Sequence, residues 1–366
     1  MTPAIPTTDN LSLDTYRLLG RSGLRVSPLS LGTMTFGSDW GWGADEPEAR
    51  RVFDTYVDRG GNFVDTASGY TQGTSERFVG DFAKGRRDRL VIATKYTMNI
   101  EAGDPNAGGN HRKSMVRSVE QSLDRLQTDY IDLLYLHVWD QTTPVDEVLR
   151  AMDDLVRAGK VLYVGISDTP AWQVSRMQAI ADLRGWSPLV ALQIEYNLIE
   201  RTVERDLIPM ARELGLGVLP WSPLARGVLT GKYSRDDVDT VGGAADPAAG
   251  RKSIAVADGS LSERGLAIAD VVGEVAEETG HSPAQVALAW TLLEPAVTST
   301  ILGVRTFAQL EDNLGALDVR FTADQRARLD EASAVELGFP HAFLQSDLPR
   351  GLIFGGATVV PRRPAA

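Results

Sequence analysis

The sequence contains no cysteine among its 366 residues. This absence excludes disulfide bonds, thiolate nucleophiles, and zinc or iron–sulfur centres held by cysteine. Basic residues are outnumbered, because 37 Lys and Arg stand against 49 Asp and Glu and leave a net charge of −12. A chain this acidic lacks the broad basic surface that nucleic acid requires, although one local basic pocket would still suffice for a small anion.

Long apolar runs are missing as well. No stretch approaches the roughly 20 apolar residues that a membrane-spanning helix needs. The segment Met1–Thr15 is polar, carries Pro3 and Pro6, and lacks the apolar core of a signal peptide. We therefore expect a soluble, cytoplasmic protein with no membrane partner. The sequence carries no signature of an oligomeric state, which stays open.

Several functional motifs are absent or incomplete. There is no G-x-G-x-x-G fingerprint, so the sequence does not indicate a Rossmann fold. The run Gly227–Tyr233 resembles a phosphate-binding loop, but it is one residue short and has Tyr in place of Ser or Thr. Three of the four histidines, His111, His281 and His341, lie away from the predicted strand ends. We therefore expect no bound metal, because a metal site needs several ligands close together.

What the sequence does contain is a regular alternation of short apolar runs and amphipathic stretches. Eight runs are typical of strands: Leu29–Gly32, Asn62–Thr66, Leu90–Lys95, Ile131–His137, Leu162–Ser167, Ala191–Glu195, Gly217–Trp221 and Ser299–Leu302. Stretches with a 3.6-residue apolar period lie between them, among them Glu46–Arg59, Lys113–Arg125, Val145–Ala158 and Val203–Leu214. The alternation implies parallel strands with right-handed crossovers, and eight such units predict an α/β fold of the (β/α)8 TIM-barrel type.

Two further segments are expected to frame the barrel. The run Tyr16–Ser27 alternates around two glycines and predicts a β-hairpin that caps the bottom of the barrel. The stretch Ser234–Asp258 is rich in Gly, Ala and Asp and predicts a long irregular loop, either a lid or a disordered segment. Ser282 and Pro283 are expected to begin a helix.

The end of the chain predicts a last helix and a tail. Thr322–Ala332 has the helical pattern, and a Pro- and Gly-rich tail follows it. Because neither an internal repeat nor an interdomain linker is visible, we expect a single domain over residues 1–366. Its core spans about 16–332, and the tail 333–366 is expected near the active site.

Four titratable side chains lie at or just after the ends of three neighbouring predicted strands. Asp65 ends the second strand, Tyr70 follows in its loop, Lys95 ends the third and His137 ends the fourth. The reacting groups of a (β/α)8 barrel come from these carboxyl ends. Each residue alone also has an ordinary explanation: a helix cap for Asp65, a solvated cation for Lys95, and a rim residue for His137. Together they predict a shared catalytic site.

The four side chains suit one chemistry. A tyrosine hydroxyl is a weak acid at neutral pH, and a neighbouring ammonium lowers its pKa while a carboxylate holds that ammonium in place. A histidine can donate a hydrogen bond to a carbonyl oxygen while the tyrosine protonates it. The set can therefore reduce a carbonyl group if something else delivers a hydride, and a nicotinamide cofactor is the obvious donor.

At this point the sequence resembles a known family. The matching runs are GNFVDTASGY, SERFVG, IATK, LYLHVWD, VGISD, QIEYN, PWSPLARGVLTGKY and GVRTFAQLEDNLGAL. They are similar to the aldo-keto reductases, in particular to the bacterial branch that also resembles potassium-channel β subunits. The resemblance covers roughly Tyr16 to Ala332. It implies a (β/α)8 barrel that reduces aldehydes or ketones with NADPH and a catalytic tetrad of Asp65, Tyr70, Lys95 and His137.

The resemblance also implies the cofactor contacts. The nicotinamide end would lie against Thr33, Met34, Asp65, Ser167, Asp168, Gln193 and Trp221. The diphosphate would be wrapped by Ser222, Leu224, Gly227 and Lys232, where a close backbone approach and a cation suit phosphate. The adenosine would lie against Gly303, Arg305, Gln309 and Asn313. From the residues alone, Trp221 could instead be a core aromatic, which is the less favoured alternative, and Arg305 could as well be a solvated cation at a helix start.

Two departures from the family pattern bear on the cofactor. Many relatives have Asn where this chain has Asp168, whose carboxylate can only accept hydrogen bonds. Many also carry Lys and Arg for the 2′-phosphate at the positions occupied here by Gly303 and Gln309. Arg305 is then the remaining phosphate partner, so NADPH is preferred and NADH stays possible.

The substrate pocket is expected to have aromatic walls. Besides Tyr70 and His137, the candidates are Trp40, Trp42, Trp139, Phe339 and Phe343. The expected activity is reduction of an aldehyde or ketone. The alternatives are NAD(P)+-dependent oxidation of a secondary alcohol or sugar hydroxyl, and a slowly turning over, redox-sensing regulatory subunit.

Overall fold

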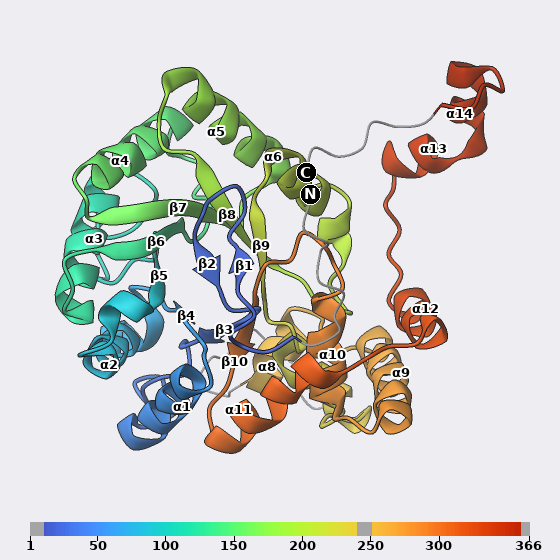
Figure 1. Ribbon diagram of the computed structural model, residues 1–366, viewed down its shortest axis with the longest axis horizontal. Coiled ribbons are helices and arrows are strands. Elements are labelled where there is room, and N and C mark those ends of the chain that lie inside the picture. Colours follow the sequence, from blue (N-terminus) through green and yellow to red (C-terminus); the bar gives the residue numbers. More distant parts are fainter. Residues whose placement is uncertain (1–10, 240–250, 360–366) are drawn as a thin grey trace.

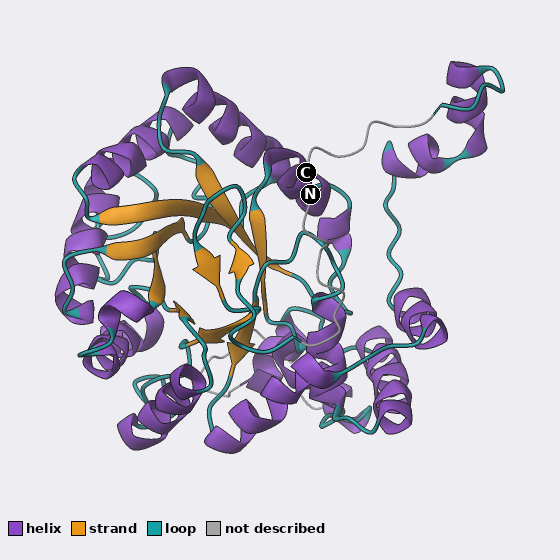
Figure 2. Cartoon of the chain, in the orientation of Figure 1, coloured by secondary structure: helices purple, strands orange, loops and turns teal. Residues whose placement is uncertain are grey.

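The computed structural model describes residues 11–239 and 251–359, and its centre is an eight-stranded parallel barrel ringed by helices (Figures 1 and 2). Spatial order follows chain order around the barrel, as the alternation of strands and helices predicted. The barrel strands are β3 (Leu29–Gly32), β4 (Phe63–Asp65), β5 (Val91–Tyr96), β6 (Ile131–Leu136), β7 (Val161–Ser167), β8 (Leu189–Glu195), β9 (Gly217–Trp221) and β10 (Thr300–Gly303). Each overlaps its predicted run, so the TIM-barrel prediction is confirmed.

The barrel closes at two junctions between distant parts of the chain. Strand β10 pairs with β3 over its whole length, from Thr300 opposite Leu29 to Gly303 opposite Gly32. On its other side, the segment just before β10 meets β9 through a bridge between Val218 and Val297. These pairings remove the exposed edges that an open sheet would have.

The helices cover the outside of the barrel. Those around the strands are α1 (Glu46–Asp58), α2 (Thr74–Ala83), α3 (Arg112–Leu126), α4 (Val145–Arg157), α5 (Ala171–Arg184), α6 (Leu207–Leu214), α9 (Glu263–Thr279), α10 (Pro283–Thr291), α11 (Phe307–Leu314) and α12 (Ala323–Ala332). Their starts follow ordinary capping chemistry. For example, the Ser282 hydroxyl accepts from the Gln285 amide, the Gln285 side chain binds back to Ser282, and Pro283 opens the first turn. The predicted helix start at this point is confirmed.

The amino end of the barrel is closed by the predicted hairpin of β1 (Arg17–Leu18) and β2 (Arg25–Val26). Leu19 and Val26 are fully buried and join the cluster of side chains that fills the barrel interior. Gly20 has a left-handed backbone conformation, with φ of +53°, and its α-carbon lies close to the backbone of β8 and β9. The bottom of the barrel is therefore packed, and the opposite end is left to form a site.

Two segments differ from the expectation. The stretch 234–258 is partly helical, because α7 (Asp236–Asp239) and α8 (Arg251–Ala257) lie within it; residues 240–250 fall outside the described part of the chain. The tail forms α13 (His341–Gln345) and α14 (Asp347–Phe354), which stand away from the barrel (Figure 1). The tail contacts the barrel domain where His341 Nε2 lies 3.0 Å from Asp206 Oδ1. Among the described helices, none is long and apolar enough for a bilayer crossing.

We expect Gly20→Ala to lower the free energy of unfolding by about 2–4 kcal/mol in a urea titration. A β-carbon at Gly20 would lie 2.3 Å from the Val190 carbonyl oxygen, and the residue would keep a φ that side chains disfavour. Gly23→Ala is the matched control in the same hairpin, because nothing lies within 4 Å of its β-carbon position. Equal effects of the two substitutions would show that the hairpin is not packed against the barrel in this way.

Candidate active site

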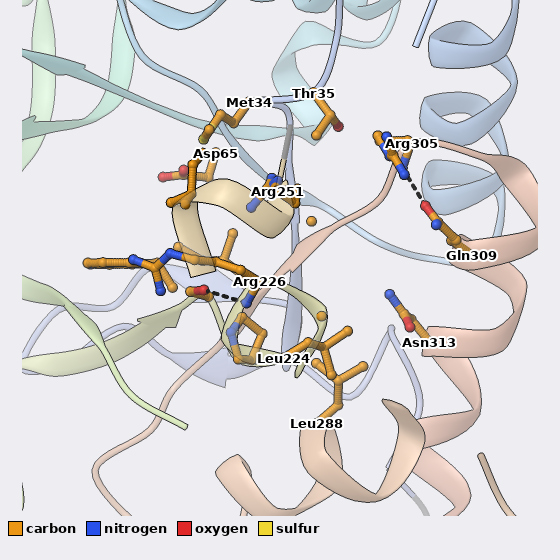
Figure 3. Close-up of a pocket in the computed structure, with 18 of the residues that line it drawn as sticks. Met34, Thr35, Asp65, Leu224, Arg226, Arg251, Leu288, Arg305, Gln309 and Asn313 are labelled. Atoms are coloured by element: carbon orange, nitrogen blue, oxygen red, sulfur yellow. Dashed lines mark hydrogen bonds between the residues drawn. The ribbon is translucent and has the colours of Figure 1, made fainter. Parts of the chain in front are cut away.

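A pocket of about 660 Å³ opens at the carboxyl end of the barrel (Figure 3). Its walls come from the strand ends, from the loops that follow β3, β5, β6 and β9, and from α8, α10 and α11. It contains Asp65, Tyr70 and His137, three of the four predicted catalytic residues. Lys95 lies directly behind them and is fully buried.

A buried ion pair holds these residues together. The Lys95 Nζ atom lies 2.5 Å from Asp65 Oδ1, donates to the Thr66 carbonyl oxygen at 2.8 Å, and lies 3.2 Å from the Tyr70 hydroxyl. Asp65 is the last residue of β4 and Lys95 is the last but one of the adjacent strand β5, and the register of the two strands places Asp65 opposite Ala93. The pairing of these two strands therefore positions the charges.

Tyr70 reaches the ion pair from a strained turn. It begins a short 3-10 segment, Tyr70–Gly73, in which Thr71 and Gln72 have φ of +45° and +53°. Such left-handed conformations are costly for residues with side chains and persist where the surroundings enforce them. The Thr71 hydroxyl donates to the Phe36 carbonyl oxygen at 2.7 Å and fixes this turn against the loop after β3.

The electrostatics of the pair differ from the expectation in one respect. Burial would lower the pKa of Lys95, but Asp65 and Tyr70 outweigh it and raise that pKa above its ordinary value. Burial raises the pKa of Tyr70, and the charge of Lys95 offsets only part of this rise. The predicted effect of Lys95, which lowers the pKa of Tyr70, is present, but removing the hydroxyl from water has the larger effect and the net shift is upward. The Tyr70 hydroxyl is therefore protonated at neutral pH.

His137 faces Tyr70 across the pocket. The two rings meet edge to face with their centroids 5.8 Å apart. Burial, together with the charge of Lys95, lowers the pKa of His137 to about 3, so its imidazole is neutral. Its Nδ1 atom is buried without a hydrogen-bond partner among the described residues.

Gln193 and Ser167 lie next to the tetrad. The Gln193 side-chain amide donates to Asp65 Oδ2 at 2.9 Å, so both carboxylate oxygens of Asp65 are held. The Ser167 hydroxyl is buried in the pocket wall and has no partner within the described chain. Beside them, the Trp221 indole donates to Asp168 Oδ1 at 3.0 Å.

The segment after β9 forms a tight cradle. Ser222, Ala225 and Arg226 all have positive φ, between +45° and +56°. Gly227 is also left-handed, and a β-carbon there would lie 2.4 Å from Lys232 Nζ. The backbone at this position is thus bare, with an ammonium directly over it, an arrangement that suits a phosphate group.

Three cations converge at the far end of the pocket without an acidic partner in the described chain. They are Lys232, Arg251 and Arg305. Burial and the other two charges lower the pKa of Lys232, which shows that the three lie close enough to repel one another. The Arg251 guanidinium lies 5.3 Å from the Trp42 ring centroid. Unpaired, mutually repelling cations are suited to a ligand with several negative charges.

Most of the predicted cofactor residues line this one pocket. Only Thr33 does not, because it is buried behind the wall, where its hydroxyl donates to the Asp65 carbonyl oxygen at 3.0 Å. Gln309 lines the pocket, but its side chain accepts from the Arg305 amide at 2.8 Å (Figure 3). The residues on the wall are Met34, Asp65, Ser167, Asp168, Gln193, Trp221, Ser222, Leu224, Gly227, Lys232, Gly303, Arg305, Gln309 and Asn313.

Only some of the predicted substrate residues line the pocket. Trp40 lines the pocket, and Trp42 contacts it with the ring centroids 5.7 Å apart and the ring planes tilted by 47°. Trp139 does not line the pocket and packs against the barrel core instead. Phe339 and Phe343 do not line it either; they contact each other in the tail, which turns away from the barrel after α12.

Sequence reasoning missed other wall residues. Met98 and Val138 line the pocket from the loops after β5 and β6, and Arg226 and Arg251 line it from the loop after β9 and from α8. Arg226 binds Glu195 at 2.6 Å and also pairs with Asp258. The sequence signal that could have pointed to Arg251 was the presence of basic residues in the stretch 234–258, which is otherwise rich in Gly, Ala and Asp.

With the geometry in view, comparison with known proteins decides the family. The model of the Aldo/keto reductase family matches residues 28–334, which is most of the chain. The chain belongs to this family. It is therefore an oxidoreductase, and the family resemblance seen in the sequence is confirmed at this level.

Individual relatives are similar over nearly the whole chain. Norsolorinic acid reductase of Aspergillus flavus is 37% identical over 93% of this chain and 87% of its own length. The aryl-alcohol dehydrogenase [NADP(+)] of Phanerodontia chrysosporium is 36% identical over 87% of this chain and 86% of its own. The uncharacterized oxidoreductase YrpG of Bacillus subtilis is 41% identical over 83% of this chain and 91% of its own length.

We expect the Asp65–Lys95 pair of this reductase-family enzyme to be strongly coupled in stability. Asp65→Asn or Lys95→Met alone leaves one buried charge without its partner, and each should lower the free energy of unfolding by about 3–5 kcal/mol. The double variant should lose less than the sum, as measured by urea unfolding. The exposed pair of Arg50 and Glu46 is the control, where removal should cost no more than about 1 kcal/mol. Additive losses at Asp65 and Lys95 would contradict the coupling.

Proposed function

We propose that this enzyme reduces an aldehyde or ketone with NADPH, with Tyr70 as the proton donor. The observation that carries the proposal is the Tyr70 hydroxyl, which lies 3.2 Å from a buried ammonium and opens onto the pocket. A neutral phenol beside a fixed positive charge can give its proton to an oxygen that becomes negative, because the ammonium then stabilises the phenolate left behind.

The residues present fit a nicotinamide dinucleotide phosphate. The buried, unpartnered Ser167 hydroxyl and the Gln193 amide would bind the carboxamide, and Trp221 would lie against the ring. The bare backbone at Gly227 with Lys232 would hold the diphosphate. The cofactor, when bound, supplies the hydride for the carbonyl carbon.

The protein groups then handle the carbonyl oxygen. His137 is neutral and without a partner in the described chain, so its N–H can orient the oxygen by a hydrogen bond. Tyr70 transfers its proton to the same oxygen, and Lys95, held by Asp65, stabilises the resulting negative charge. Gln193 fixes the second oxygen of Asp65 and so keeps Lys95 in place.

We further propose an aromatic carbonyl compound as the substrate class. Trp40, backed by Trp42, and the exposed side chains of Met98 and Val138 form an apolar wall near Tyr70. Flat apolar walls of this kind suit aromatic rings. The names of two relatives agree with this choice, because they refer to an aryl alcohol and to norsolorinic acid.

Tyr70→Phe should lower the rate of carbonyl reduction by about 10²–10⁴-fold while leaving cofactor affinity unchanged. Absorbance of NADPH and NADH would be followed with a panel of aldehydes, ketones and keto-sugars, with Tyr130→Phe as the control. Retained turnover would remove Tyr70 from the acid role.

The same screen, run with NADP+ and NAD+ on alcohols and sugars, separates the alternative functions. Turnover in that direction alone would make the enzyme a dehydrogenase. Tight binding with no turnover would favour the regulatory role suggested by the resemblance to channel subunits.

Arg305→Ala should weaken NADPH binding about 10–100-fold more than NADH binding. The reason is that the guanidinium has no acidic partner in the described chain and would lose its contact with the 2′-phosphate. Calorimetric titration of both cofactors checks this, with the exposed Arg184→Ala as the control. Equal losses for both cofactors would show that Arg305 does not distinguish them.

A further inference from the structure

Asp168 places a carboxylate in the pocket without a cation bound to it. Its Oδ1 atom accepts from the neutral Trp221 indole at 3.0 Å, and no ion pair to it occurs among the described residues. The carboxylates nearest to it are neutralised. Asp65 is paired with Lys95, and Glu195 is paired with Arg226.

The position of this carboxylate is enforced. Asp168 has φ of +37°, a conformation that costs energy in a residue with a side chain. Its backbone carbonyl accepts from the Trp139 amide, and its own amide donates toward the Gln193 carbonyl oxygen. The backbone is therefore held from both sides, next to Ser167 at the end of β7.

The surroundings set when this carboxylate is charged. Loss of hydration against the pocket walls raises the pKa of Asp168 to about 6, and the charge of Glu195 adds to the rise. The Trp221 hydrogen bond and the charge of Lys95 lower the pKa in part. Of the other titratable groups near it, Lys95 is paired with Asp65, Glu195 is paired with Arg226, and Tyr70 remains neutral over the physiological range. Asp168 is therefore negative above about pH 6 and neutral below it.

We propose that Asp168 makes the site bind the oxidised form of the nicotinamide cofactor more tightly than the reduced form. This inference rests on the proposed function, which brings the nicotinamide end to Ser167, Gln193 and Trp221. The oxidised ring carries a positive charge, whereas the reduced ring is neutral and the two molecules are otherwise alike. A carboxylate without its own cation interacts favourably only with the charged ring. Because Asp168 lines the pocket but is itself solvent-exposed, this difference acts only at short range.

The consequence is a bias in the direction of the reaction. A site that stabilises the oxidised cofactor makes the bound cofactor a weaker oxidant and a stronger hydride donor. An amide at this position would keep a hydrogen-bond acceptor for Trp221 but would remove the charge. Asp168 thus tunes how readily the bound cofactor gives up hydride, and the tuning is lost when the carboxylate is protonated.

Binding of NADP+ and NADPH by calorimetry at pH 8 and pH 5 tests this role. The informative quantity is the ratio of the NADPH to the NADP+ dissociation constant, because titration of the 2′-phosphate is common to both ligands and cancels. At pH 8 the ratio should fall about tenfold in Asp168→Asn. In the unsubstituted protein it should fall similarly between pH 8 and pH 5, whereas in Asp168→Asn it should not change.

Asp312→Asn is the matched control. Asp312 also lines the pocket, but its carboxylate binds Ser282 and Gln285 beside the adenosine-side residue Asn313, so its loss should leave the ratio unchanged. The role of Asp168 would be overturned if Asp168→Asn bound both cofactors with the same ratio of dissociation constants as the unsubstituted protein. It would also be overturned if the ratio in the unsubstituted protein did not depend on pH. Failure of both cofactors to bind would instead overturn the proposed function together with this inference.

Discussion

The buried ion pair of Lys95 and Asp65 is the interaction on which the site depends. A lysine with no exposed surface is unfavourable unless its charge is fully compensated. Here Asp65, the Thr66 carbonyl and the Tyr70 hydroxyl surround the ammonium. Because both charges lie on paired strands, their separation is set by the barrel and not by a loop. A rigid ion pair of this kind keeps the charge beside the Tyr70 hydroxyl in a fixed position.

Backbone strain is concentrated around the same pocket. Thr71 beside Tyr70, Asp168 at the end of β7, and Ser222 in the cradle all have left-handed conformations. Each follows a barrel strand and is tied by hydrogen bonds to a neighbouring segment. The stable barrel thus supports local conformations that the loops alone would not adopt, and these conformations aim side chains into one space.

Much of this arrangement could be predicted from the sequence, because it follows from periodicity. The apolar runs gave every barrel strand within about two residues, and strand ends that meet at one rim brought Asp65, Lys95 and His137 together. Contacts between segments far apart in the chain could not be predicted from periodicity. Nothing in the local pattern reveals that α8 returns Arg251 to the pocket, or that the tail with Phe343 turns away from it. The net pKa of Tyr70 also depends on burial in three dimensions, which a list of neighbouring charges does not contain.

The cluster of Lys232, Arg251 and Arg305 has a kinetic consequence in a chain of net charge −12. At a distance, an approaching polyanion meets the repulsion of the whole molecule, and the three cations attract it only within about one Debye length, roughly 8 Å at physiological salt. Added salt screens the long-range repulsion more than it screens the attraction between the cluster and an anion that is already close. Capture of an anionic ligand is then helped by moderate ionic strength, the reverse of the behaviour of enzymes that steer their ligands by an overall charge of opposite sign.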